Sequence, residues 1–298
     1  KGSAMRKHMI HKMTAIAILA ISSLVGCGGG GGSGGTSTKT GYFIDSAVEG
    51  LEYTSGSTTG ITGADGSFKY EEGKPVTFKI GNMVLGSLTV TNSRVFPVDL
   101  VSGATDESHP KVSLMAQILQ TLDSDGDASN GITITETARK AISQTIDVAS
   151  ADPSQTSSAI NLLLSNATAD RTGGSTAALV SDTSAKTHLQ ANLVKEFAGN
   201  WSSTFKGSDS GTCQVTIAQS GSIEGICNST LAGDFTISGR VNSSGSWENA
   251  SGTSSSGTAN GTATTGAVFS GTYSRSGTAS GTWTNGANYS GNWTMAKQ

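Results

Sequence analysis

Hydrophobic and polar residues alternate over short stretches in the first part of this chain. Between Gly41 and Leu100 the alternation predicts strands at 41–44, 67–70, 76–80 and 83–85, because successive side chains of a strand point to opposite faces. The sequence Ala64-Asp65-Gly66-Ser67 is typical of a hairpin turn and predicts one between two of these strands. We expect a small β-sandwich-like unit here.

After Pro97 the hydrophobic period lengthens to that of a helix. Pro110 suits a first helical turn, and one face of a helix over 110–122 would carry Val112, Met115, Ile118, Leu119 and Leu122. The same reasoning predicts a second helix from Thr135 to about Ile146 and helical segments over 159–164 and 177–197. Residues 41–195 are therefore expected to form a β-unit followed by helices.

Short alternations return in residues 197–298 and fill that region. They predict strands at 201–205, 213–218, 223–227, 235–241, 246–249, 267–273, 279–284 and 289–294. Glycines 271, 281 and 291 fall on the same strand faces as Tyr273, Trp283 and Trp293, where they would make room for rings from neighbouring strands. The expected architecture is an antiparallel barrel or sandwich, so the whole fold should be mainly β with a helical insertion.

This meander of strands resembles avidin-type and lipocalin-type β-barrels. The resemblance implies an interior that could hold a small apolar ligand. An interior packed solid with aromatic rings is the alternative, and we favour it because the sequence offers no polar anchor for a ligand.

The N-terminal segment has the pattern of a signal peptide over residues 1–26. Basic residues precede the apolar run Ala15-Ile16-Ala17-Ile18-Leu19-Ala20-Ile21, which is too short to span a bilayer. Residues 1–4 precede Met5 and look like upstream sequence. The chain is therefore expected to be exported.

The tetrapeptide Leu24-Val25-Gly26-Cys27 resembles the lipobox of bacterial lipoproteins. The resemblance implies cleavage before Cys27, acylation of its thiol with chains such as palmitate, and a membrane anchor. Gly28 is not the aspartate of an inner-membrane retention signal, so the outer membrane of the cell envelope is the expected location. Residues 27–40 would form a flexible linker rich in Gly, Ser and Thr. An ordinary secretory signal cut elsewhere is the alternative.

Composition agrees with an exported β-protein and excludes one class of partner. The chain has 40 glycines and only 14% charged residues. Residues 1–26 contain four basic residues and no acidic one, so their removal leaves 15 basic against 22 acidic residues and a formal charge of −7. Without a basic stripe to neutralise phosphates, nucleic acid is not an expected partner.

Cys213 and Cys227 are the two cysteines left once Cys27 carries lipid. In a hairpin centred on Ser220 these residues lie opposite one another, and the exported compartment favours oxidation. We expect a disulfide between them.

An acidic loop separates the first two predicted helices. Asp123, Asp125 and Asp127 alternate, which would aim three carboxylates into one concave loop, as calcium requires. Helix, loop and helix together resemble an EF-hand, although Glu136 is the fourteenth residue of the loop instead of the twelfth. If residues 128–130 contain an insertion, the resemblance implies a structural calcium ion held by Asp123, Asp125, Asp127, Asn130 and Glu136. The alternative is a solvated loop whose side chains only cap helix ends and turns.

No catalytic site emerges from the sequence. After cleavage only His109 and His188 remain, and the spacings of common hydrolase and metalloprotease motifs are missing from the sequence. We therefore expect a non-catalytic cell-envelope lipoprotein that acts as a surface structural, interaction or adhesion module, with a protein or a surface as partner. A carrier that binds a small ligand inside the C-terminal barrel is the alternative.

Overall fold

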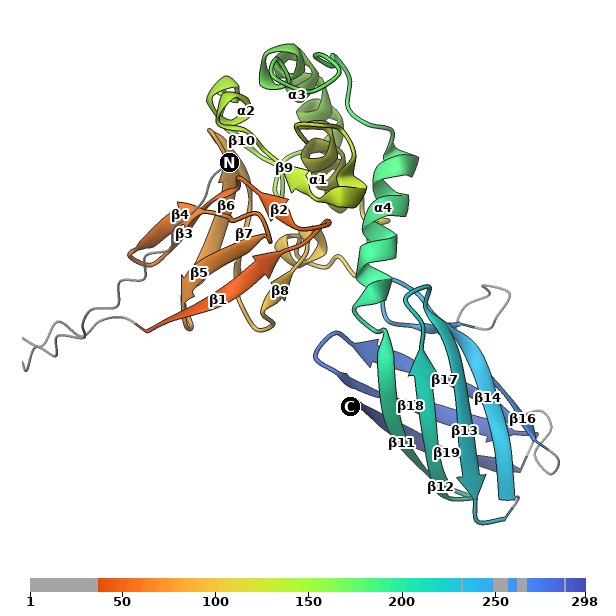
Figure 1. The fold of residues 1–298 in the computed structure, drawn as a ribbon. Helices are drawn as coiled ribbons and strands as arrows, with labels where there is room; N and C mark the ends of the chain where they lie inside the picture. The colour runs from red at the N-terminus through yellow and green to blue at the C-terminus, as the bar shows by residue number, and fades with distance from the viewer. Residues whose placement is uncertain (1–36, 232, 249–256, 262–266, 287) are drawn as a thin grey trace, which may run out of the picture. The chain divides into compact units, whose positions relative to one another are not determined.

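The computed structural model describes residues 37–231, 233–248, 257–261, 267–286 and 288–298 (Figure 1). The predicted signal peptide and Cys27 lie outside the described residues. Buried apolar side chains form two clusters, one from Phe43 to Leu193 and one from Phe197 to Met295. Among the described helices none is long and apolar enough to cross a bilayer. The fold is mainly β with helices inserted between two β-regions, as predicted.

Two small sheets form the first β-region. One sheet has the order β5 (Ser67–Glu71), β1 (Thr38–Phe43), β8 (Arg94–Val95). The other has the order β10 (Ile146–Asp147), β7 (Met83–Thr89), β6 (Pro75–Ile80), β3 (Glu52–Ser55), β4 (Thr58–Ile61). Phe43 and Phe68 of the first sheet each lie 4.9 Å, between ring centroids, from Phe78 of the second. The two sheets therefore share a core, which confirms the sandwich-like unit.

The turn before β5 forms, but it does not join the two strands of a hairpin. Gly66 has a φ of 78° and its amide donates to the carbonyl of Gly63, and Ser67 N donates to Asp65 Oδ1. A side chain at residue 66 would also approach the carbonyl oxygen of Phe43. However, β5 pairs with β1 and not with β4, which precedes the turn. The predicted strands 41–44 and 67–70 do pair, as β1 with β5, but β3 and β4 lie between them in the chain. Turn chemistry fixes a chain reversal and not the strand with which the next segment pairs.

The first helix is confirmed. Helix α1 spans Pro110–Thr121, and all five side chains predicted to face inward are buried. His109 is its N-cap residue, and the Nδ1 atom accepts a hydrogen bond from Lys111 N at 3.3 Å. This histidine therefore has a structural role at the start of the helix.

The later helices differ from the predictions in their bounds. Helix α2 spans only Glu136–Ala141, because the carbonyl of Ile142 accepts a hydrogen bond from Asn82 N and the chain then enters β10 beside β7. Helix α3 spans Pro153–Ala167 and begins earlier than predicted, with Asp152 capping two backbone amides. Helix α4 spans Asp182–Lys195 and begins later, at the N-cap Ser181.

Antiparallel strands close into a barrel in the last part of the chain (Figure 1). Each strand pairs with the next, and the last pairs with the first. The strands are β11 (Gly199–Gly207), β12 (Gly211–Ile217), β13 (Ser222–Ser229), β14 (Gly233–Val241), β16 (Gly257–Gly261), β17 (Ala267–Ser274), β18 (Thr278–Asn285) and β19 (Tyr289–Lys297). The short β15 (Trp247–Glu248) adds to β14, and β16 is a strand that the sequence did not predict.

The predicted disulfide is confirmed. Strands β12 and β13 pair so that Cys213 lies opposite Cys227, and their sulfur atoms are bonded. The hairpin therefore has the predicted centre at Ser220.

Glycines of the barrel strands make room for aromatic rings, as predicted. Gly271 and Gly281 are paired neighbours, and a Cβ atom on either would lie less than 3 Å from the Trp293 ring. The indole nitrogen of Trp293 donates to the carbonyls of Ser270 and Thr282, both at 3.1 Å. The ring is thereby fixed across two neighbouring strands.

Candidate functional site

Asp123 anchors the acidic loop to the β-region. Its side chain is buried, and Oδ1 accepts a hydrogen bond from Thr133 N at 2.9 Å. Thr133 belongs to β9 (Ile132–Thr133), which pairs in parallel with β2 (Val48–Glu49). Within the described part of the chain, the other oxygen, Oδ2, has no hydrogen-bond partner. A buried carboxylate oxygen without a donor is costly unless a proton or a cation reaches it.

Asp125 lies beside this buried carboxylate. Burial, and to a smaller extent the adjacent Asp125 carboxylate, raise the pKa of Asp123 to about 6. The pKa of Asp125 is instead lowered, first by the hydrogen bond from the Asn130 side chain and then by that from Asp127 N. These donors are Asn130 Nδ2 at 2.9 Å and the amide of Asp127 at 2.9 Å. Asp123, Asp125 and Asn130 are thus brought together.

The remaining two predicted ligands have other partners. Asp127 is the N-cap residue of the short 3-10 turn Ala128–Asn130, and its Oδ1 accepts hydrogen bonds from the amide and the hydroxyl of Ser129. Glu136 is exposed and pairs with Lys140 Nζ at 2.5 Å. Over the described residues, no group of three His, Cys, Asp or Glu side chains is placed to hold a metal ion. The five-ligand calcium set stays a prediction.

A positive charge lies against the same loop. The Arg171 side chain packs on Gly126, and its Nη1 donates to the Thr121 carbonyl at 3.4 Å. Arg171 and Asp127 line a cavity of about 570 Å³ together with Gln120 and His188. The cavity therefore connects the acidic loop with a second polar cluster.

This second cluster, made by Asp45, Ser46, Gln120, His188 and Asn192, was not predicted from the sequence. Ser46 Oγ lies 3.2 Å from His188 Nε2, although 142 residues separate them in the chain. Ser46 has a φ of 36°, a conformation that residues other than glycine rarely adopt. Asp45 is fully buried, and its Oδ2 accepts a hydrogen bond from Gln120 Nε2 at 3.1 Å. A strained serine beside a histidine raises the question of catalysis.

Hydrogen bonding around His188 argues against an activated serine. The Asp45 carbonyl lies 2.5 Å from Nε2, nearer than the Asn192 amide nitrogen at 3.1 Å or the Ser46 hydroxyl at 3.2 Å. Because a carbonyl can only accept, this shortest contact favours the tautomer with the proton on Nε2. That atom then has no lone pair to take the proton of Ser46. Burial lowers the pKa of His188, which favours the neutral ring. The cluster is best explained as a support that ties the turn after β1 to α4.

Asp45 makes the stability of the folded protein depend on pH. Burial raises the pKa of Asp45 well above its ordinary value, and the neutral His188, 4.0 Å from Oδ1, supplies no charge to offset it. A raised pKa means that the folded state holds the proton more tightly, so stability falls as pH rises from the unfolded pKa through the folded one. We expect Asp45→Asn to stabilise the protein by about 1 kcal/mol or more at pH 8, with little effect at pH 4. Thermal unfolding at both pH values measures this.

Asp65→Asn is the matched control. Asp65 is an exposed turn carboxylate whose pKa is lowered by hydrogen bonds from Ser67. Its contribution therefore has the opposite sign, being present at pH 8 and lost as pH falls through the lowered pKa. If Asp45→Asn destabilised the protein equally at both pH values, Asp45 would not be a buried acid that resists ionisation.

The third candidate site is the barrel interior, which could serve as a ligand cavity. Trp201, Trp247, Tyr273 and Trp293 are all buried, and their neighbouring ring centroids lie 5.1 to 6.0 Å apart. The indole nitrogens of Trp247 and Trp283 have no hydrogen-bond partner among the described residues. Five cavities outside this cluster of rings are formed by the described residues, and none of the four rings lines them. These rings lie at packing distance from one another inside the barrel.

Comparison with known proteins does not assign the chain to a family. No family model, no curated protein and no solved structure matches it.

Proposed function

We propose that this protein is a lipid-anchored component of the bacterial cell envelope whose folded part is a non-catalytic surface structural, interaction or adhesion module. The observation that carries this proposal is the close packing of aromatic rings inside the barrel. A barrel filled in this way offers other molecules its outer surface and not its interior. The tautomer that the Asp45 carbonyl favours at His188 supports the non-catalytic part of the proposal.

The anchor in this proposal is Cys27 in the outer membrane. We expect the full chain, expressed in a bacterium fed a labelled fatty acid, to incorporate the label and to sediment with outer membranes. Cys27→Ser should abolish the label and release the protein from the membrane fraction, because two or three acyl chains are what makes the anchor durable. Cys213→Ser is the control and should keep the label. Label in both variants, or in neither, would contradict lipidation at Cys27.

Native mass spectrometry distinguishes the module from a carrier. The full chain carrying Cys27→Ser would be purified oxidised and without chelator, and then added to intact cells. A surface module should carry no organic mass and should bind to cells or to a macromolecule. A stoichiometric organic adduct that is lost in Trp247→Ala would instead establish the carrier, with the partnerless indole nitrogens as its anchors.

We also propose a structural calcium ion at the acidic loop, held by Asp123 and Asp125 with backbone and water oxygens completing its shell. The partnerless, buried Oδ2 of Asp123 supports this smaller ligand set. Calcium at 10 mM should stabilise the protein by about 1.4 to 2.7 kcal/mol if affinity is in the range of extracellular modules. Differential scanning calorimetry with calcium and with chelator measures the change.

Variants separate this set from the five-ligand prediction. Asp123→Asn with Asp125→Asn should remove the effect of calcium, whereas Glu136→Gln should keep it, because Glu136 pairs with Lys140. Loss of the effect in Glu136→Gln would support the EF-hand-like set instead. If 10 mM calcium did not stabilise the unsubstituted chain, the proposed calcium site would be wrong.

A further inference from the structure

A groove of about 870 Å³ runs over the outer face of the barrel at β12, β13 and β14. Figure 1 shows these three strands side by side. Two rows of paired residues supply the side chains of its wall. Each row runs across neighbouring strands, from one residue to its pairing partner. The first row contains Gln214 and Ile226, and the second contains Asn200, Thr216, Glu224 and Ser238. Outward side chains lie about 4.8 Å apart between strands and about 7 Å apart along a strand, so the groove presents a regular array of polar groups.

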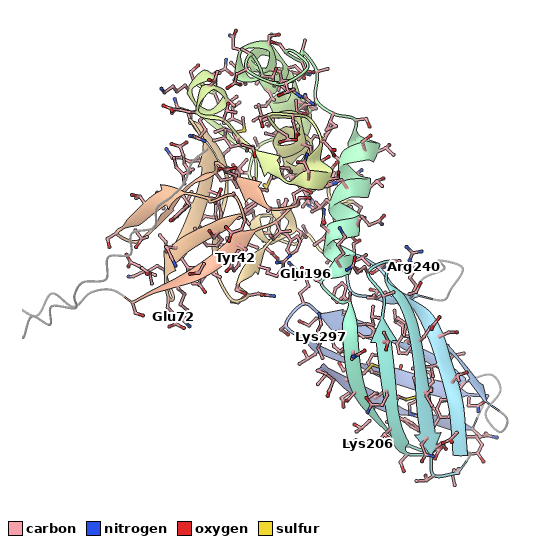
Figure 2. The ribbon with its side chains drawn as sticks, viewed as in Figure 1. Tyr42, Glu72, Glu196, Lys206, Arg240 and Lys297 are labelled. Atoms are coloured by element: carbon pink, nitrogen blue, oxygen red, sulfur yellow. A yellow bond between two sulfur atoms is a disulfide. The ribbon has the colours of Figure 1, made fainter. Side chains whose placement is uncertain are left out.

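The groove contains very little charge. Among the described residues that line it, Glu224 is the one with a charged side chain, and none is a lysine or an arginine. Lys206 and Arg240, both labelled in Figure 2, lie at opposite ends of the strands. Arg240 is two residues beyond Ser238 on β14, and Lys297 pairs with Trp201 beside Asn200, so these two cations border the groove without lining it. The exposed residues of β12, of β18, and of β19 from Ser290 to Ala296 are also uncharged, consisting of Ser, Thr, Asn, Gln and Ala, whereas β19 ends in the exposed Lys297. A phosphate-rich or acidic polymer would find no counter-charge in the groove.

The polar side chains of the groove keep donors for a ligand. Thr216 Oγ1 donates to Asn200 Oδ1 at 3.1 Å, and Ser202 Oγ donates to Gln214 Oε1 at 3.4 Å. Both contacts occupy the amide oxygens, which leaves the two NH₂ groups as donors beside the Glu224 carboxylate, an acceptor. Ile226 is 68% exposed between them and adds one apolar contact. Amide donors, a carboxylate acceptor and a small apolar patch match a molecule that has many hydroxyl groups and C–H faces.

We infer that this groove binds an uncharged polysaccharide chain. Vicinal hydroxyls would bridge Glu224 and the amide of Gln214, while the C–H face of a sugar ring would lie on Ile226. A protein partner fits less well, because protein interfaces centre on buried aromatic or arginine anchors and the groove lining contains neither. The inference rests on the proposed surface module and names the class of its partner.

Affinity electrophoresis of the full chain carrying Cys27→Ser tests this inference. Native gels would contain dextran, a soluble β-glucan, a galactomannan or, as an acidic comparison, hyaluronan. We expect retardation by at least one uncharged polysaccharide and none by hyaluronan. Gln214→Ala and Glu224→Ala should each weaken that retardation about tenfold, which corresponds to the loss of one strong hydrogen bond.

Ser280→Ala and Thr282→Ala are the controls, because both residues lie on the outer face of β18, outside the groove. They should bind as the unsubstituted chain does, and circular dichroism would establish that all variants fold. Absence of retardation by all three uncharged polysaccharides, stronger binding to hyaluronan, or retardation that Gln214→Ala leaves unchanged would overturn the inference. If the protein still bound intact cells in that case, the proposal of a surface module would be kept and only the polysaccharide partner would be rejected.

Discussion

Trp293→Ala should lower the free energy of unfolding of the barrel by about 3 to 5 kcal/mol, the usual cost of truncating a buried aromatic residue. The Trp293 ring contacts Trp247 and Tyr273, with centroid distances of 5.3 and 6.0 Å, and lies over two glycines that cannot fill the space it leaves. Its removal would also take the indole donor from the carbonyls of Ser270 and Thr282. Denaturant unfolding followed by near-ultraviolet circular dichroism measures the loss.

Tyr289→Ala provides the control within the same strand. Tyr289 is 51% exposed, so its truncation removes much less buried surface and should cost below about 1 kcal/mol. Equal effects of the two substitutions would mean that Trp293 does not occupy a packed interior. That result would also weaken the case against a carrier.

The second large effect is expected from the disulfide. Replacing both Cys213 and Cys227 with serine should destabilise the barrel by about 3 kcal/mol, because the bond closes a loop with a sequence separation of 14 residues and restricts the unfolded chain. Two buried hydroxyls would also face one another where the sulfur atoms now pack. Thermal unfolding of the oxidised protein and the double variant measures the difference.

Reduction offers an independent check of the same quantity. The unsubstituted protein in excess reductant should unfold at nearly the temperature of the double variant, whereas the variant should not respond to reductant. A double variant as stable as the oxidised protein would show that the hairpin register alone holds β12 and β13 together.

Most strands of the barrel were predictable because the residue pattern within each strand identifies it. Large apolar residues alternate with polar ones in β11 to β14, and glycines mark where rings pass in β17 to β19. Strand β16 was missed because its sequence, Gly-Thr-Ala-Asn-Gly, has no alternation of large apolar residues. Its place is defined by backbone pairing with β14 and β17, which a single sequence does not display.

Features that depend on contacts between distant segments could not be predicted. The approach of His188 to Asp45 and Ser46 depends on how α4 packs against the turn after β1. Likewise, α2 ends where Asn82 from the loop before β7 bonds to the Ile142 carbonyl. The alternating aspartates did locate a cluster with a partnerless carboxylate oxygen, but the lysine that pairs with Glu136 determines where that side chain points.

Each of the eight strands that form the barrel pairs on both sides within the described residues. Such a ring leaves no row of free backbone groups on which a neighbouring molecule could add a strand. If the proposed lipid anchor holds many copies on one membrane, their barrels should therefore touch without polymerising into a shared sheet. The first β-region differs, since β4 is an outer strand with Ile61 52% exposed, and association of partly unfolded copies should begin there.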